Sequence, residues 1–373
     1  MSRRELAYDS RHALNAICPY YTMFPIEYPL KILRRFRKDS PVVFDPFCGR
    51  GTTIYAARYL GLRSWGMDTS PIATAIARAK IASASLDEVI EAAEDLLLIE
   101  PKDIPQSRFF RTAFAPSTLK QICALREGLL KDDGANDAYV LLRAAAMGCL
   151  HGPKSKSVEQ AGYFSNQMPR TYASKPDYSI SYWKANDLKA PKIDVLPVLK
   201  RKLSRICSST LDFPTPASLV VNSDARDLAF RSNLSKETSI VITSPPYYGM
   251  RTYVQDQWLR NWFLGGSAEI EYTNTEQLSH SGKDVFVGEL ASIWKRLLRS
   301  QSENLDLYLR FGSIRSAKSE AKQIIRESLE ESGGWKLISV RGAATAAAGK
   351  RQADQMGSES SAPKEYDFHV KRA

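Results

Sequence analysis

The sequence predicts an α/β protein, with a mostly parallel sheet and helices on both of its faces. Residues 42–44 (VVF) form a short apolar run that leads through Asp45 into a turn containing Gly49 and Gly51, and a helical pattern follows over residues 52–60. A strand, a glycine turn and a helix in this order begin a nucleotide-binding βαβ unit. Residues 240–242 (IVI) are a second apolar run, as expected of a strand buried on both faces of a parallel sheet.

The other elements alternate in the same way. Further strands are predicted at residues 63–67, 218–222, 305–311, 335–340 and 366–370, and helices at 29–36, 72–82, 254–264, 286–300 and 318–331. Between the second and third strands the pattern becomes largely helical, near residues 86–99, 117–131, 136–150 and 194–208. The sequence therefore predicts a core of residues 1–83 and 215–373, interrupted by a helical and basic insertion of residues 84–214.

Composition favours a polyanionic partner. The 373 residues carry a net charge of +11, and such an excess most simply suits nucleic acid. The five cysteines include no C-x-x-C pair and the four histidines show no ligand spacing, so we expect reduced thiols and no metal site. Because no stretch approaches the ~20 apolar residues of a membrane span, we expect no membrane partner and a cytoplasmic location.

Two carboxylates follow predicted strands near the glycine turn. The third glycine of the dinucleotide fingerprint is replaced by Ile54, which favours a ligand smaller than a dinucleotide at this turn. Asp68 ends the second strand, where an acidic residue can accept both hydroxyls of a ribose; the alternative is a helix cap, a role for which Ser70 is already available. Asp224 lies beyond the third strand and could accept from the amino group of an adenine.

The stretch Ser244-Pro245-Pro246-Tyr247 follows the apolar run at 240–242. The two prolines fix the backbone as it leaves the sheet. They place a hydroxyl, carbonyl oxygens and an aromatic ring at the ligand-binding edge. This set suits a flat substrate with an exocyclic amino group. The alternative is a plain turn with a core tyrosine.

An aromatic and basic stretch from residue 154 to 184 is predicted to be irregular. Basic residues interleaved with aromatics and amides suit phosphate contacts, base stacking and base-edge readout; the alternative is a structured loop whose aromatics form a secondary core. The candidate DNA-binding residues are Lys154, Lys156, Asn166, Gln167, Arg170 and Arg251.

Together these motifs resemble the class I S-adenosylmethionine-dependent DNA amino-methyltransferases. Residues 45–53 (DPFCGRGTT) match the cofactor motif of that family, residues 243–247 (TSPPY) match its catalytic motif, and residues 21–25 resemble the segment over the methionine part of the cofactor. The resemblance implies a Rossmann-like sheet and S-adenosyl-L-methionine as cofactor. The implied cofactor-binding residues are Tyr21, Thr22, Met23, Phe24, Asp45, Phe47, Gly49, Gly51, Thr52, Thr53, Asp68, Thr69, Ser70, Asp224 and Ala225.

The resemblance also implies the reaction. Serine at position 244 is typical of cytosine-N4 methylation, while adenine-N6 enzymes more often carry aspartate there; an RNA amino-methyltransferase is a further alternative. Ser244, Pro245, Pro246 and Tyr247 would hold a base flipped out of duplex DNA, and a cognate restriction endonuclease is an expected partner. The cofactor motif precedes the catalytic motif, the reverse of the commonest order, so the target-recognition region cannot be copied from the family. The insertion is the first candidate for it, and residues 265–285 are the second.

Overall fold

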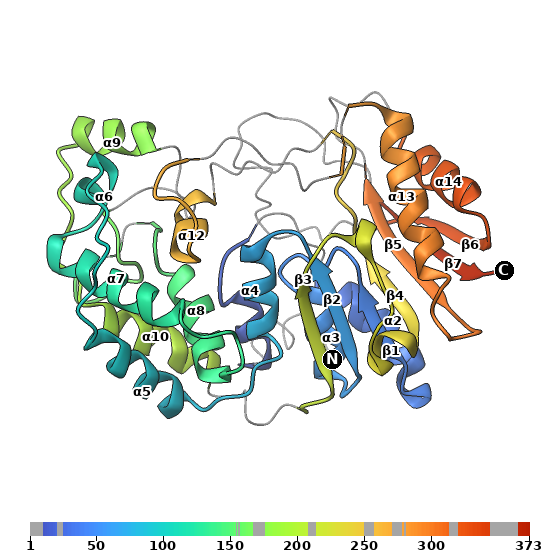
Figure 1. Ribbon diagram of the computed structural model, residues 1–373, viewed down its shortest axis with the longest axis horizontal. Helices are drawn as coiled ribbons and strands as arrows, with labels where there is room; N and C mark the ends of the chain where they lie inside the picture. Colours follow the sequence, from blue (N-terminus) through green and yellow to red (C-terminus); the bar gives the residue numbers. More distant parts are fainter. Residues whose placement is uncertain are drawn as a thin grey trace. The chain divides into compact units, whose positions relative to one another are not determined.

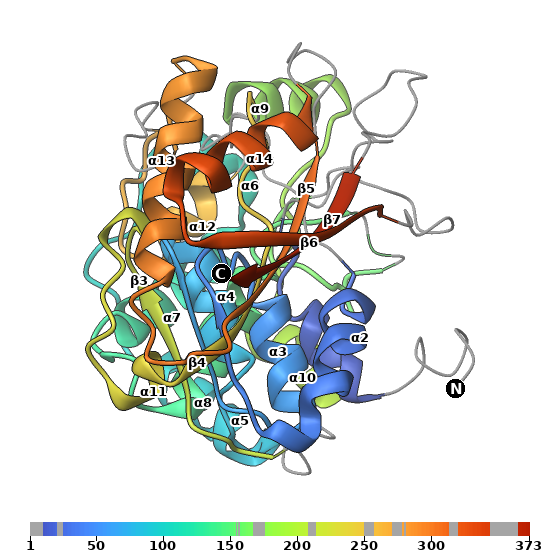
Figure 2. The ribbon, with the colours of Figure 1, turned by 90° about the vertical axis from the view of Figure 1, so that its right-hand side faces the viewer.

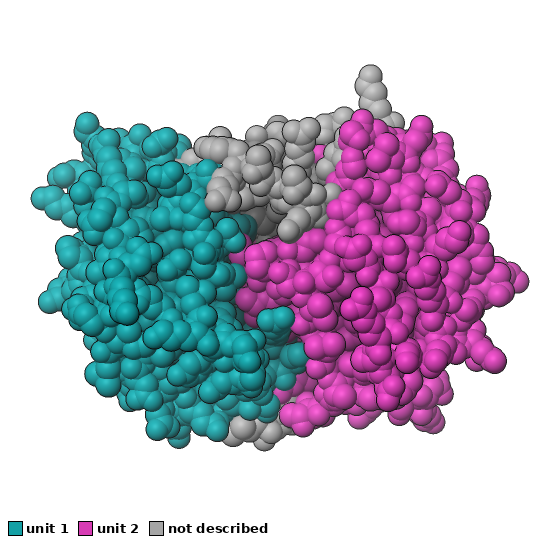
Figure 3. All heavy atoms as spheres, in the orientation of Figure 1, with its two compact units in different colours: residues 1–19, 78–213, 253–274 teal, residues 20–77, 214–252, 275–373 magenta. Residues whose placement is uncertain are grey.

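The structure is a computed structural model in which two compact units are found (Figure 3). It describes residues 10–20, 25–153, 155, 157–166, 176–207, 214–249, 257–270, 278–279, 281–312, 320–343 and 365–373. Unit 1 comprises residues 1–19, 78–213 and 253–274, and unit 2 comprises residues 20–77, 214–252 and 275–373. All of the predicted insertion except its last residue falls in unit 1. That unit also takes residues from both predicted parts of the core.

The described residues of unit 2 contain a seven-stranded sheet in the order β3-β2-β1-β4-β5-β7-β6 (Figure 1). The first five strands in this order are parallel, and β7 runs antiparallel to both β5 and β6. This is the mostly parallel, Rossmann-like class I methyltransferase sheet that the sequence predicts. The strands are β1 Val42–Asp45, β2 Ser64–Asp68, β3 Ser218–Asn222, β4 Thr238–Thr243, β5 Asp306–Gly312, β6 Trp335–Gly342 and β7 Glu365–Arg372.

Helices cover both faces of this sheet, as predicted. Helices α2 (Glu27–Phe36) and α3 (Thr52–Tyr59) lie on one face, and α13 (Lys283–Leu297) and α14 (Ala321–Ser332) lie on the other (Figure 2). Side chains alternate along β2, which explains why this strand contacts helices on both faces of the sheet. Trp65 and Met67 belong to the hydrophobic cluster that contains α13 and α14. A Cβ added to Gly66, which lies between them, would meet Ile54 of α3 at 3.0 Å.

Shorter elements connect the strands of unit 2. Helix α4 (Pro71–Ala79) begins in this unit with proline as its first residue, and the backbone N–H of Ala73 donates to the hydroxyl of Ser70 (3.3 Å). The cap predicted at Ser70 is therefore present. Helix α11 (Asn233–Lys236) and the 3-10 helices Arg37–Asp39 and Ala225–Asp227 complete the described helices of the unit.

The described part of unit 1 is helical. It contains the 3-10 helix Ser10–Ala16, α5 (Leu86–Leu97), α6 (Arg108–Ala113), α7 (Pro116–Leu129), α8 (Asp137–Met147), α9 (Pro176–Ala185), α10 (Val195–Cys207) and α12 (Trp258–Phe263). The four helices predicted in the insertion are confirmed as α5, α7, α8 and α10.

The irregular stretch predicted at 154–184 is wrong over its last part, which forms helix α9. A proline in the first turn is compatible with a helix, and Trp183 and Phe164 are fully buried in unit 1. Burial of these two rings supports the alternative in which the aromatics form a secondary core. Among the described residues, no helix is both long enough and apolar enough to span a membrane.

Candidate cofactor and substrate site

The predicted ligand-binding residues of unit 2 follow four neighbouring strands. The strand order reverses between β1 and β4, since β2 and β3 extend the sheet beyond β1 while β5 extends it beyond β4. Open α/β sheets bind ligands outside the carboxyl ends of their strands at such a reversal. The glycine turn follows β1 and Ser244 follows β4, so the two motifs meet at this point of the sheet.

Asp45 joins the two motifs through its side chain. One carboxylate oxygen accepts hydrogen bonds from the hydroxyl of Thr243 (2.6 Å) and the backbone N–H of Phe47 (3.1 Å), and the other accepts from the hydroxyl of Thr53 (2.7 Å). Burial raises the pKa of Asp45 to about 7, and these hydrogen bonds oppose the rise. The predicted cofactor residues Asp45 and Thr53 therefore position the turn against the catalytic motif, and the Asp45 carboxylate faces protein atoms.

The two glycines of the turn serve different purposes. Both have positive φ, +49° at Gly49 and +77° at Gly51, a region that side chains other than glycine rarely adopt. A Cβ on Gly51 would lie 2.8 Å from the Cβ of Ala77 in α4, whereas a Cβ on Gly49 would meet no atom within 4 Å. Gly51 thus allows α3 to begin close to α4, with Thr52 buried in its first turn. Of the two turn glycines, Gly49 is the one with open space beside its backbone.

Asp68 holds the glycine turn from the end of β2. Its two carboxylate oxygens accept hydrogen bonds from the backbone N–H groups of Gly49 (2.9 Å) and Ser70 (2.9 Å). Burial raises the pKa of Asp68, and the two hydrogen bonds lower it. Asn222 of β3 fixes the same loop by donating to the carbonyls of Asp68 and Thr69 (both 2.9 Å). Because each carboxylate oxygen can accept a second hydrogen bond, Asp68 can hold the turn and still accept from ribose hydroxyls.

Asp224 is engaged by a neighbouring arginine. It caps the 3-10 helix that begins at the buried Ala225, and the Arg226 guanidinium contacts both of its carboxylate oxygens, at 2.6 Å in the shortest hydrogen bond. Partial burial raises the pKa of Asp224, but the hydrogen bonds and charge of Arg226 outweigh it and hold the pKa below its usual value. Arg226 also pairs with Glu289 of α13 (2.7 Å), which accepts from the N–H of Ser279 (2.6 Å). An adenine amino group bound at Asp224 must therefore share it with Arg226.

The predicted catalytic residues 244–247 follow β4 without regular secondary structure, and they differ in exposure. Ser244 and Pro246 are partly exposed, Pro245 is buried, and Tyr247 is 8% exposed. The Tyr247 ring packs edge-to-face on Phe311 of β5, with ring centroids 5.3 Å apart. The predicted stacking of a base on Tyr247 must therefore displace part of this packing.

The Tyr247 hydroxyl donates to a carboxylate oxygen of Glu365 at the start of β7 (3.0 Å). Burial raises the pKa of Tyr247 far above its usual value, Glu365 raises it further, and Ser244 opposes the rise. The tyrosine therefore stays neutral and keeps its hydrogen bond to Glu365.

An ion pair lies next to this group. Arg310 of β5 makes two parallel hydrogen bonds to Asp367 of β7 (2.7 and 2.9 Å), and its guanidinium lies 4.1 Å from the ring centre of Tyr28 in α2. Glu365 also contributes to the electrostatic environment of Arg310. The Arg310–Asp367 ion pair thus joins β5 to the start of β7, the segment that also carries Glu365.

The sequence analysis missed these β7 carboxylates, together with Arg226 and Glu289. Glu365 and Asp367 are two residues apart on a strand and therefore point to the same face. The sequence signal that could have identified them is a pair of acidic residues two positions apart at the start of the last predicted strand. Their partners Tyr247 and Arg310 are 118 and 57 positions away in the chain, so the pairs appear only once the strand order is known.

Several predicted site residues cannot be placed, and one is placed where it was not expected. Asn166 is buried, and its side-chain amide donates to the carbonyls of Thr112 (3.3 Å) and Leu188 (3.1 Å). This geometry does not support its predicted contact with DNA, since the amide joins segments of unit 1. Outside the described residues lie Tyr21, Thr22, Met23, Phe24, Lys154, Lys156, Gln167, Arg170 and Arg251.

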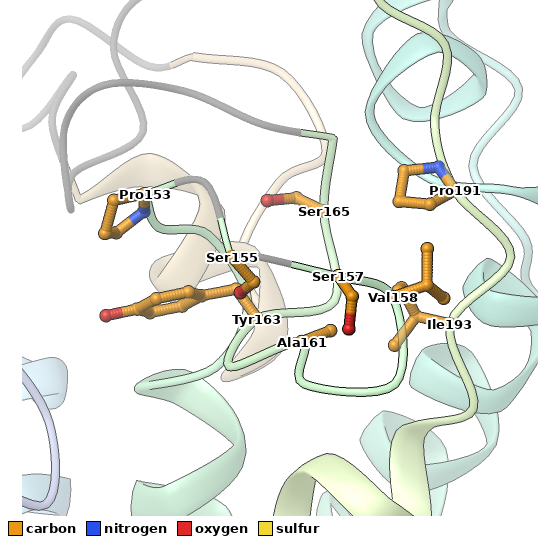
Figure 4. Close-up of a pocket in the computed structure, with 9 residues that line it drawn as sticks. All are labelled: Pro153, Ser155, Ser157, Val158, Ala161, Tyr163, Ser165, Pro191 and Ile193. Atoms are coloured by element: carbon orange, nitrogen blue, oxygen red, sulfur yellow. The ribbon is translucent and has the colours of Figure 1, made fainter.

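A small cavity lies in unit 1. Its volume is about 20 Å³, and its lining includes Ser155, Tyr163 and Ser165 (Figure 4). This volume suits about one water molecule. The cavity is therefore too small for a nucleoside or a flipped base.

The strand order of unit 2 and the residues at its strand ends agree with the Rossmann-like fold that the sequence predicts. Residues 4–78 match the family model N6_N4_Mtase, described as DNA methylase. The match supports an amino-methyltransferase of the N4/N6 type. It contains the glycine turn and Asp68, and it ends before the motif at Ser244.

Solved structures of two methyltransferases are distantly similar to the chain. The rRNA methyltransferase AviRa from Streptomyces viridochromogenes is 13% identical, with 99% of this chain and 95% of that chain covered and a TM-score of 0.35. Magnesium protoporphyrin IX methyltransferase (ChlM) from Synechocystis PCC 6803, solved with bound SAM, is 8% identical, with 100% and 95% covered and a TM-score of 0.33. Similarity at this level does not inform the site. No curated protein matches the sequence.

Proposed function

We propose that the protein transfers a methyl group from S-adenosyl-L-methionine to the exocyclic N4 amine of cytosine in duplex DNA, as the modification enzyme of a restriction–modification pair. One observation carries the proposal. Asp45 hydrogen-bonds both Thr53, in the helix after the glycine turn, and Thr243, directly before Ser244. This connection joins the glycine turn to the strand end before Ser244 at one strand-order reversal, which supports the proposal that cofactor and amine bind side by side there.

The residues of the turn fit the proposed cofactor. The space beside Gly49 leaves room for a ligand against the backbone, and Asp68 retains lone pairs for the ribose hydroxyls. Asp224 and the buried Ala225 follow the next strand and would meet the adenine. When bound, the cofactor supplies an electrophilic methyl group on a sulfonium leaving group.

The residues of the motif fit an amine that loses its proton after methyl transfer. Ser244 is partly exposed and uncharged, so it can orient an exocyclic amine through its oxygen without acting as a strong base. Transfer then depends on the orientation of the two reactants and on polar groups placed around the amine. Serine at this position favours cytosine N4 over adenine N6, through the family resemblance, and the net charge of +11 favours a nucleic acid target.

Mass spectrometry of the product tests the proposal. Purified protein is incubated with unmethylated duplex DNA of mixed sequence and isotopically labelled S-adenosylmethionine, and the DNA is digested to nucleosides. We expect labelled N4-methylcytosine. Labelled N6-methyladenine would assign the reaction to the adenine enzymes, and label only in a parallel RNA sample would overturn the DNA target. Sequencing of the modified positions would then give the site at which a cognate endonuclease should be blocked.

A further inference from the structure

We propose that Arg226 is a positioning residue for the cofactor, which fixes the Asp224 carboxylate so that one acceptor position is left for the exocyclic amine of the adenine. This inference rests on the function proposed above, in which Asp224 meets the adenine. Arg226 lies in the 3-10 helix that Asp224 caps. Its side chain joins Asp224 to a second carboxylate, that of Glu289 in α13.

Arg226 occupies most of the hydrogen-bonding capacity of Asp224. Its backbone N–H donates to Oδ1 (2.7 Å), Nη2 donates to Oδ2 (2.6 Å), and Nε lies 3.1 Å from Oδ1 and 3.0 Å from Oδ2. These N–H groups are the donors to Asp224 among the described residues, and a carboxylate offers about four acceptor positions, so roughly one is left. The Asp224 side chain is 20% exposed, which leaves this position within reach of a ligand.

Glu289 holds the same guanidinium from the opposite direction. Nη1 of Arg226 donates to Oε1 of Glu289 (2.7 Å), and Oε2 of Glu289 accepts from the backbone N–H of Ser279 (2.6 Å). A guanidinium is planar and presents its donors in a rigid fork. Its orientation, once fixed by α13, therefore also fixes the plane of the Asp224 carboxylate. The compact ammonium of a lysine cannot reproduce this fork.

A fixed carboxylate discriminates between amino and oxo purines. The amine of adenine can donate to it, whereas hypoxanthine presents a carbonyl oxygen at the same position, and an ionised carboxylate has no proton to donate to that oxygen. Burial raises the pKa of Asp224, but Arg226 holds the pKa below its usual value, so the group remains an acceptor. Without Arg226 the carboxylate is free to turn and to accept from the N1–H of hypoxanthine instead. Arg226 should therefore favour the adenine form of the cofactor.

The ratio of two dissociation constants tests this role without DNA. Calorimetric titration compares S-adenosylhomocysteine, the demethylated form of the cofactor, with its deaminated analogue S-inosylhomocysteine. We expect the wild-type protein to prefer the adenosyl ligand by roughly 10- to 100-fold, the scale of one hydrogen bond to a charged group. Arg226→Gln should lose most of this preference, and Arg226→Lys, which keeps the charge without the fork, should restore only part of it. Asp224→Asn, whose amide can donate to the oxo oxygen, marks the full effect.

The ratio separates orientation from stability, because a general loosening of the fold weakens both ligands alike. Glu327→Gln is the matched control, since it removes a charged partner of Lys283 in α13 (2.7 Å) and should keep the wild-type ratio. Unfolding midpoints identify the folded variants, and Arg226→Lys decides if Arg226→Gln does not fold.

A folded Arg226 variant with the wild-type ratio would overturn the positioning role, while the proposed function would stand. A wild-type protein that binds both ligands equally would remove Asp224 from the adenine, and the inference with it. A wild-type protein that binds neither ligand would overturn the proposed cofactor and therefore the proposed function itself.

Discussion

Asp45 shows how one side chain can matter for both stability and function. Its carboxyl group lies inside unit 2, between the glycine turn and the catalytic motif, and burial raises its pKa from 3.8 to about 7. Because the folded protein keeps a proton that the unfolded chain loses, the stabilisation is complete below the unfolded pKa. It is lost as the pH rises towards about 7.

Asp45→Asn should therefore flatten this pH dependence. The amide can donate to the hydroxyl of Thr53, which can in turn donate to the Ile242 carbonyl 3.2 Å away, so the hydrogen bonds are replaceable. We expect the free energy of unfolding to fall less steeply between about pH 4 and pH 7, by up to ~1.4 kcal/mol per pH unit. Urea unfolding at several pH values measures this slope. An unchanged slope would mean that Asp45 does not titrate over this range.

Asp68 should determine cofactor affinity. Asp68→Ala removes the acceptor for the ribose hydroxyls and also the hydrogen bonds that hold Gly49 and Ser70, so we expect S-adenosylmethionine to bind more weakly by about 1–3 kcal/mol. Asn222→Ala is the matched control, because it loosens the same loop through its carbonyls without removing the carboxylate. Calorimetric titration should show a clearly smaller loss for the control. Equal losses would assign the effect to the loop and remove Asp68 from the ribose.

At the scale of elements, the turn between β1 and α3 needs a positive φ at both of its glycines, and at Gly51 it also needs close packing against α4. Substitution of each glycine in turn can separate these two requirements. Gly51→Ala places a methyl group 2.8 Å from Ala77 in α4, which adds overpacking of about 1–3 kcal/mol to the strain of a positive φ. Gly49→Ala carries the strain alone, roughly 1–2 kcal/mol, but fills the space beside the turn. We expect Gly51→Ala to show the larger loss of stability in chemical unfolding. Gly49→Ala should lose cofactor affinity while remaining folded; normal affinity in that variant would place the ligand elsewhere.

The sequence correctly predicted those elements whose local residue pattern agrees with their burial in the structure. β3 begins and ends where predicted, and β1, β2 and α3 each lie within a residue of their predicted bounds, since buried parallel strands and glycine-ended helices carry strong local signals. Helices α6 and α9 were missed because they are short and aromatic, and their stability comes from tertiary packing. Phe109 of α6 contacts Trp183 of α9 at 5.7 Å between ring centroids, a contact between residues 74 positions apart that periodicity cannot reveal.

The candidate site shows the same limit. The strand-end positions of Asp68, Asp224 and Ser244 follow from the order of apolar runs along the chain. The engagement of Asp224 by Arg226 and of Tyr247 by Glu365 depends on side-chain packing that no motif encodes. Sequence reasoning therefore located the strand ends that carry the candidate residues but left out the charged groups that contact them.

At the scale of the whole molecule, the candidate cofactor residues and most of the candidate DNA-binding residues fall in different units, Arg251 of unit 2 being the exception. The glycine turn, Asp68 and Ser244 fall within unit 2, whereas Lys154, Lys156 and Arg170 fall within the chain segments of unit 1. A protein built in this way can vary its target contacts without changing its chemistry. If the proposed DNA target is correct, the excess of basic residues, 52 against 41 acidic, should contribute to DNA affinity, which can be measured independently of catalysis.

DNA affinity should fall with rising salt, and the basic insertion should account for part of the slope. Each phosphate neutralised by a lysine or arginine contributes about 0.9 to the slope of log K against log salt, so replacing Lys154, Lys156 and Arg170 together by glutamine should reduce it by roughly 2–3. The matched control replaces Lys31, Arg34 and Arg37, which are exposed. The 3-10 helix that contains Arg37 leads into the start of β1, at the sheet edge opposite the ligand residues. Fluorescence anisotropy with duplex DNA at several salt concentrations measures both slopes. A wild-type slope in the insertion variant would show that these three residues of the insertion do not contact DNA phosphates. An equal reduction in the control variant would show that the net charge of +11 attracts DNA without a specific contact from the insertion.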